Sequence, residues 1–241
     1  MAGILRDEDR LQDVVSLCRK ALSVDPESTQ ALSLLGNAYM DHKDYASALP
    51  CLRKAAAIQP KLTQYQQSLA ACFIYLKRYP EAEGILHIIL RDYPKFPLVN
   101  FHLGLVAEEQ GDLALAESSY RKEIEFYPRS VPARFNLGKL LLKKGDFDGY
   151  MAEMNEIVTI APDAPEGFLF LARGQLRDPA ADLSTVEANV ERGLKNARAA
   201  DLRALGWFLM ADIYSRRHQP DKVQEALRQA NHFKALQEKS Q

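Results

Sequence analysis

The sequence predicts an all-α protein, a solenoid of stacked antiparallel helix pairs, and three observations lead to this fold class. Proline recurs with a spacing of 34 residues, at Pro26, Pro60, Pro94, Pro128 and Pro162. A leucine followed by a small residue recurs at the same spacing, and the apolar residues between these markers fall at helical intervals. A fixed period of roughly 20–50 residues marks a repeat array, in which neighbouring pairs stack because one pair cannot bury its own apolar face.

The leucine row lies in the first helix of each pair. Its members are Leu35, Leu69, Leu103, Leu137 and Leu171, and Gly or Ala follows each of them. A residue this small lets the second helix approach closely. The second helix carries a row of its own at the same period, Ala48, Ala82 and Ala116, and the recurring proline ends it.

A short polar turn separates the two helices of a pair. In Gly111-Asp112, glycine can leave the first helix and aspartate can cap the second. Lys43-Asp44 and Gly145-Asp146 stand at equivalent places. The fifth repeat instead has the six residues Arg177–Asp182 at this point, so we expect a longer loop there.

These positions resemble the pattern of the tetratricopeptide repeat family. That pattern combines a large residue, Leu-Gly, an aromatic, a small residue, a second large residue, Ala and a closing Pro. Residues 29–62 match it with Leu32, Leu35, Gly36, Tyr39, Ala48, Leu52, Ala55 and Pro60. The resemblance implies a right-handed superhelix in which the first helices of successive repeats line a concave groove. In this family such a groove receives an extended peptide or a helix of a partner protein.

We interpret residues 1–241 as a single helical-repeat domain. It comprises a half repeat at 1–28, repeats at 29–62, 63–96, 97–130 and 131–164, a degenerate repeat at 165–203, and a last repeat with a cap at 204–241. The half repeat matches only a second helix. We therefore expect either that the chain is cut from a longer protein or that this helix pairs with something else. The residues expected on the inner face of the cap are Val223, Leu227, Ala230, Phe233 and Leu236.

Composition and motifs exclude several function classes. A net charge of −1 gives no basic field for nucleic acid, and no apolar run approaches the roughly 18 residues of a membrane span. Cys18, Cys51 and Cys72 have no metal-ligand spacing, so we expect free, packed thiols and a cytoplasmic location. There is no nucleophile elbow, dinucleotide fingerprint, phosphate loop or paired-histidine motif. We therefore expect a non-catalytic protein without cofactor or metal.

The expected function is a protein–protein interaction scaffold. The family's groove positions are the fifth, sixth and ninth of each repeat, and the resemblance carries them over to Asn37, Phe101, His102, Leu105, Phe135, Asn136, Lys139, Leu169 and Arg173. The centre of this set is apolar and holds two cations, which suits a segment with apolar anchors and a carboxylate. The alternative for Phe101 and Phe135 is that they fill space between neighbouring helices.

Two other functions stay open. Residues 169–227 loosely resemble the repeat tails of bacterial sulfatase-like or transferase proteins, which implies an accessory or regulatory domain of a larger enzyme. Self-association through the terminal helices is the other, because the first helix has no partner within its own half repeat.

Overall fold

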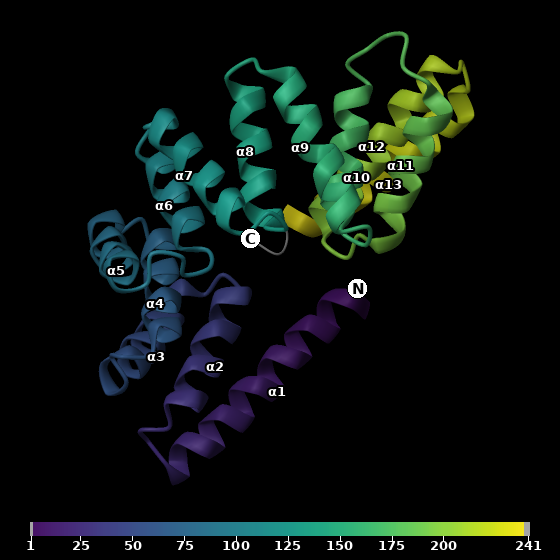
Figure 1. Cartoon of the computed structure of the whole chain (residues 1–241). Helices are drawn as coiled ribbons and strands as arrows, with labels where there is room; N and C mark the ends of the chain where they lie inside the picture. Colours follow the sequence, from purple (N-terminus) through teal and green to yellow (C-terminus); the bar gives the residue numbers. More distant parts are fainter. Residues whose placement is uncertain (1, 239–241) are drawn as a thin grey trace. The chain divides into compact units, whose positions relative to one another are not determined.

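The computed structural model describes residues 2–238, with side chains from residue 11 onward, and over this range the chain forms thirteen α-helices and no strand (Figure 1). Consecutive helices pack as pairs, and within each unit each pair packs against the next. The predicted all-α fold of stacked helix pairs is confirmed. The contacts divide the chain into two compact units, Met1–Pro128 and Arg129–Gln241.

The first unit holds one leading helix and three pairs. Helix α1 packs against α2, and the pairs are α2 with α3, α4 with α5 and α6 with α7. The bounds are α1 Ala2–Val24, α2 Thr29–Asp41, α3 Tyr45–Ile58, α4 Thr63–Tyr75, α5 Tyr79–Asp92, α6 Val99–Glu109 and α7 Leu113–Phe126.

The second unit holds three further pairs, α8 with α9, α10 with α11 and α12 with α13. Their bounds are α8 Val131–Lys143, α9 Phe147–Ile160, α10 Pro165–Gln175, α11 Leu183–Asn196, α12 Ala200–Arg216 and α13 Pro220–Glu238. Helix α13 has 19 residues, whereas the other second helices have 14 each. Its inner face differs in part from the expectation: Ala230 is buried as expected, but Ala226 is buried as well and Leu227 is 38% exposed.

Five of the pairs turn within three residues, and the middle residue of each turn has a left-handed backbone. These residues are Lys43, Lys77, Gly111, Gly145 and His218, with φ between 57° and 86°. In three of the turns the next residue is an aspartate whose carboxylate accepts an N–H of the second helix, as predicted: Asp44, Asp112 and Asp146. The tight turn therefore depends on a residue that can reach positive φ.

The fifth pair turns differently because Pro179 stands 34 residues after Gly145, at the position that needs positive φ. The proline ring fixes φ near about −65°. Helix α10 ends at Gln175, and residues 176–182 form a seven-residue loop before α11. The longer loop predicted for this repeat is confirmed, and Asp182 at its end caps α11.

The recurring glycines make room for a large residue of the paired helix. A Cβ atom on Gly36 would lie 2.6 Å from the side chain of Leu52, and one on Gly104 would lie 2.5 Å from the ring of Tyr120. Both large side chains are fully buried. The small residue of the repeat pattern thus sets the helix–helix distance within a pair.

A contact between neighbouring repeats also recurs at the turn end of the pairs. It joins the first residue of the second helix in a pair to the residue that stands 30 positions later in the sequence. Tyr45 stacks on Tyr75 with ring centroids 4.8 Å apart, and the Tyr79 hydroxyl donates to Glu109 at 3.2 Å. In the second unit, the Arg177 guanidinium lies 5.0 Å from the Phe147 ring centroid. Equivalent positions therefore link neighbouring repeats by a ring stack, by a hydrogen bond and by a cation–π contact.

Candidate peptide-binding surface

The structure distributes the predicted groove residues over four helices. Asn37 lies on α2, and Phe101, His102 and Leu105 lie on α6 of the first unit. In the second unit, Phe135, Asn136 and Lys139 lie on α8, and Leu169 and Arg173 lie on α10. All are on first helices of pairs, as the repeat register requires.

In the second unit, side chains of α8 and α10 meet. The rings of Phe135 and Phe170 pack edge to face, with centroids 4.8 Å apart and planes at 87°. This arrangement places the positive edge of one ring against the negative face of the other. Both rings are partly exposed. We call the surface formed by Phe135, Asn136, Lys139, Phe170 and Arg173 the α8–α10 surface.

The surface also includes two cationic side chains, Lys139 and Arg173. The ammonium of Lys139 lies 5.6 Å from the Phe135 ring centroid and 3.4 Å from Oδ1 of Asn136, whose Nδ2 donates to the carbonyl of Pro132 at 3.2 Å. The ring and the amide together hold the ammonium beside the apolar surface. The side chain of Arg173 is exposed on α10.

Tyr150 of α9 fixes the position of Phe170. It is fully buried, and its hydroxyl donates to the carbonyl of Phe170. Burial raises the pKa of Tyr150 to about 12, while Arg173 and Arg177 act in the opposite direction. The hydroxyl is therefore a proton donor at neutral pH, and it holds the α10 backbone beneath the aromatic pair.

Leu169 does not lie on this surface, and its inclusion among the groove residues was wrong. Its side chain is completely buried. A Cβ atom on Gly193 of α11 would lie 2.6 Å from the Leu169 side chain, and one on Gly206 of α12 would lie 3.2 Å from it. The two glycines leave a space that Leu169 fills, and its neighbour Phe170 is the partly exposed apolar residue instead.

In the first unit, the predicted residues make packing contacts. Leu105 packs against the apolar core of the α3–α6 region, and the Phe101 ring lies 6.0 Å from that of buried Tyr120. The contact with Tyr120 favours the space-filling interpretation of Phe101. Asn37 is exposed on α2.

His102 is set into the same part of α6. Burial lowers its pKa to about 4, and its Nδ1 is buried without a hydrogen-bond partner among the described residues. The imidazole is therefore neutral at physiological pH and offers no positive charge to a bound carboxylate.

The start of α6 depends on a residue that sequence patterns did not identify. Leu98 has φ of 64°, and its N–H donates to Oε1 of Glu123 at 2.7 Å. Glu123 comes from α7 and is completely buried. The sequence around an acidic residue in a second helix does not indicate that it caps another helix, because the contact spans 25 residues of sequence.

The described side chains contain no group of three or more His, Cys, Asp or Glu that could hold a metal ion. Between residues 2 and 238, no helix has both the length and the apolar character needed to cross a membrane. The three cysteines are free thiols, as predicted.

The stacked helix pairs place the chain in the class of helical-repeat proteins. Comparisons with known families identify the kind of repeat. Models described as tetratricopeptide repeat match residues 73–131 and 131–164. A model described as anaphase-promoting complex, cyclosome, subunit 3 matches residues 7–87. Residues 73–164 therefore consist of tetratricopeptide repeats.

Curated relatives are distant and much longer. The chain is 26% identical to BBSome complex member BBS4 of Bos taurus over 161 residues, 67% of this chain and 31% of the relative. It is 26% identical to intraflagellar transport protein 70A of Homo sapiens over 202 residues, 80% of this chain and 30% of the relative. The chain thus spans about a third of the length of these relatives.

Solved structures share the fold. PilF of Pseudomonas aeruginosa has a TM-score of 0.66 at 17% identity, covering 83% of this chain and 89% of that one. A thermophilic tetratricopeptide repeat protein of Thermus thermophilus has a TM-score of 0.63 at 20% identity, covering 76% of this chain and 98% of that one. At such identities the likeness concerns the fold alone.

Proposed function

We propose that this protein is a non-catalytic interaction scaffold that binds a peptide segment or a helix of a partner protein. The observation that carries the proposal is the α8–α10 surface, where Lys139 lies over one ring of a partly exposed aromatic pair and the exposed Arg173 belongs to the helix that carries the other ring. Such a surface serves recognition, because it offers apolar contact area together with oriented charge.

The chemistry of this surface specifies the kind of segment. An apolar side chain of the partner would pack on the rings of Phe135 and Phe170 and supply most of the affinity. A carboxylate of the partner would pair with Lys139 or Arg173, which would mainly set its orientation and its association rate. Both features agree with a segment that carries apolar anchors and at least one acidic group.

The relatives support a role within an assembly. They are a BBSome complex member and an intraflagellar transport protein. We infer that the natural partner of this chain is likewise a protein subunit of a larger assembly.

The test begins with a displayed peptide library selected on the wild-type protein. Selected sequences should combine apolar residues with Asp, Glu or a free C-terminus. The paired change Lys139→Glu and Arg173→Glu should weaken their binding by about tenfold or more, since like charges then face the carboxylate. A matched control reverses two exposed lysines elsewhere in the same unit, Lys195→Glu and Lys234→Glu. If both double variants bind as the wild type does, recognition lies outside the α8–α10 surface.

A second candidate function, self-association, has one observation in its favour. On α1 the side chains of Leu17 and Val24 are 66% and 88% exposed. Cys51 and Ile58 occupy the equivalent positions in the next second helix and are partly buried there. Sedimentation at several concentrations tests this function: Leu17→Ser should abolish any dimer, and a concentration-independent monomer excludes the candidate.

A further inference from the structure

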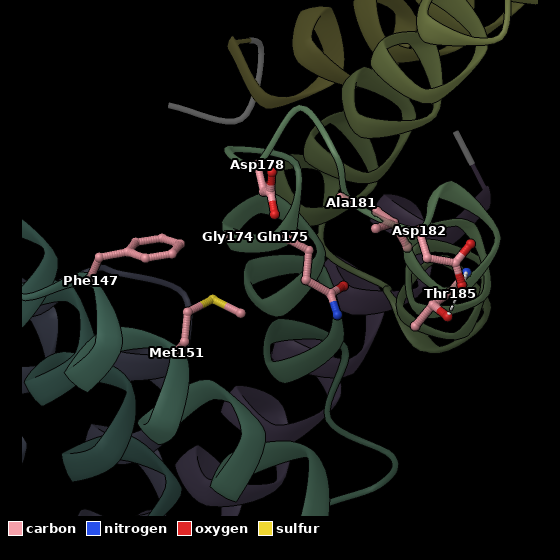
Figure 2. A pocket seen from close by; sticks show the side chains of 9 residues that line it. Phe147, Met151, Gly174, Gln175, Asp178, Ala181, Asp182 and Thr185 are labelled. Atoms are coloured by element: carbon pink, nitrogen blue, oxygen red, sulfur yellow. Dashed lines mark hydrogen bonds between the residues drawn. The ribbon is translucent and has the colours of Figure 1, made fainter.

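A pocket of about 330 Å³ lies beside the seven-residue loop of the second unit (Figure 2), and no residue of the α8–α10 surface lines it. Three elements and the loop line it. The lining residues are Phe147 and Met151 of α9, Gly174 and Gln175 of α10, Asp178, Ala181 and Asp182 of the loop, and Thr185 and Val186 of α11.

The pocket is a consequence of the altered turn. Because Pro179 cannot take positive φ, the chain leaves α10 early and returns to α11 through the wide loop. Gly174 contributes as well, since a Cβ atom there would lie 2.4 Å from Sδ of Met151. The five pairs with three-residue turns lack this loop.

The loop that forms one wall is held in place. The Arg216 guanidinium of α12 donates to the carbonyl of Asp178 at 3.1 Å and to that of Leu176, while Asp212 holds the same guanidinium at 3.1 Å. The carboxylate of Asp178 accepts the N–H of Ala180 at 2.8 Å. The pocket is therefore preformed, which lowers the entropic cost of binding.

Its walls have two different characters. Phe147, Met151 and Val186 form an apolar side, and the carboxylates of Asp178 and Asp182 lie on the loop side. The hydrogen bonds from the Thr185 hydroxyl and from the backbone of Ser184 lower the pKa of Asp182, so it is ionised at neutral pH. Among the described residues, Oδ2 of Asp178 accepts no hydrogen bond, so this oxygen is available to a ligand.

Three arginines lie near the pocket. Two of them pair with carboxylates that do not line it, and the third contacts its aromatic wall. Arg216 pairs with Asp212, and Arg217 pairs with Glu187. The guanidinium of Arg177 lies 5.0 Å from the centroid of Phe147, a lining residue. This internal contact shows that the aromatic wall accepts a guanidinium.

We propose that this pocket binds an arginine side chain from a partner protein. The volume lies at the lower end of the range for ligand sites, roughly 300–1,000 Å³, and suits one long side chain. The methylene groups of arginine would lie on Met151 and Val186, and its planar guanidinium would reach the carboxylate of Asp178. The oxygens of Asp182 already accept hydrogen bonds in the α11 cap. Asp182 would therefore attract the guanidinium through its negative charge and not through a direct hydrogen bond.

The experiment uses the full chain with carbon-13 labelled methionine methyl groups, and the probe is N-acetylarginine N-methylamide at constant ionic strength. The methyl signal of Met151, assigned through Met151→Leu, should shift and saturate, while the signals of Met40 and Met210 stay unchanged. The neutral probe N-acetylnorleucine N-methylamide, which keeps an aliphatic chain but lacks the guanidinium, should cause no saturating shift. An unshifted Met151 signal, or an equal response to the neutral probe, overturns the proposal.

The variant Asp178→Asn then tests the carboxylate. Asparagine keeps the acceptor for the Ala180 N–H, so the loop should retain its shape. Binding of the arginine probe should weaken by about tenfold, because a hydrogen bond between charged groups is lost. Asp163→Asn, an exposed site in the connection before α10, serves as control and should change nothing. Equal affinity in wild type and Asp178→Asn contradicts the assignment. None of these readouts depends on Lys139 or the aromatic pair, so the α8–α10 surface is tested separately.

Discussion

Two ionisable side chains lie inside the α6–α7 pair, and burial shifts their pKa values in opposite directions. It lowers the pKa of His102 to about 4 and raises that of Glu123, while the hydrogen bond from Leu98 opposes the shift at Glu123. In both cases the interior disfavours the charged form. The two groups therefore respond differently to acid.

His102 should make the fold sensitive to acid. Its folded pKa lies below the unfolded value of about 6.5, so its stabilising effect is complete above pH ~6.5 and is lost as the pH falls toward 4. We expect the melting temperature to fall over this range in the wild type and to fall less in His102→Gln. Exposed His87→Gln, in the same unit, is the matched control and should follow the wild type. Identical pH profiles for wild type and His102→Gln would rule out this origin.

At the scale of secondary-structure elements, the start of α6 depends on Glu123. Removing the carboxylate in Glu123→Ala leaves the N–H of Leu98 without its partner and opens a cavity. We expect a loss of about 1–3 kcal/mol in the free energy of unfolding, measured with urea. Glu123→Gln, which retains an acceptor oxygen, should lose less. Equal losses in the two variants would assign the effect to packing alone.

The loop between α10 and α11 depends on Arg216. In Arg216→Ala the hydrogen bonds to the carbonyls of Leu176 and Asp178 disappear, so residues 176–182 should open more often. Amide hydrogen exchange should accelerate in that segment and remain unchanged in α9. Arg228→Ala removes an exposed arginine on α13 and should leave the loop unaffected. Unaltered amide exchange of the loop in Arg216→Ala would show that Pro179 and the Asp182 cap are enough to hold residues 176–182 in place.

The sequence predicts elements well here because the repeat register determines them. Helices, tight turns and caps follow from local residues, and even the long loop follows from Pro179 standing where φ must be positive. Contacts set by more distant packing could not be predicted. Leu169 fills a space created by Gly193 and Gly206 of other helices, and the Glu123 cap joins residues 25 positions apart. The α8–α10 surface was thus predicted only in part.

At the scale of the whole molecule, stability in a repeat protein approximates a sum of repeat terms and nearest-neighbour terms. Each pair packs against its neighbours within a unit, and the contacts separate the chain into Met1–Pro128 and Arg129–Gln241. A local defect should therefore loosen its own unit far more than the other one.

Leu86→Ala tests this expectation. Leu86 of α5 is completely buried, so the change should cost about 2–5 kcal/mol through lost contacts and the remaining cavity. Amide exchange should then accelerate in α4 and α6, while α10 and α12 keep their protection, because their nearest neighbours are unchanged. Leu115→Ala, the same substitution at an exposed site of α7, controls for the loss of a leucine. An equal loss of protection in α12 and α4 would mean that all thirteen helices between residues 2 and 238 unfold as one cooperative unit.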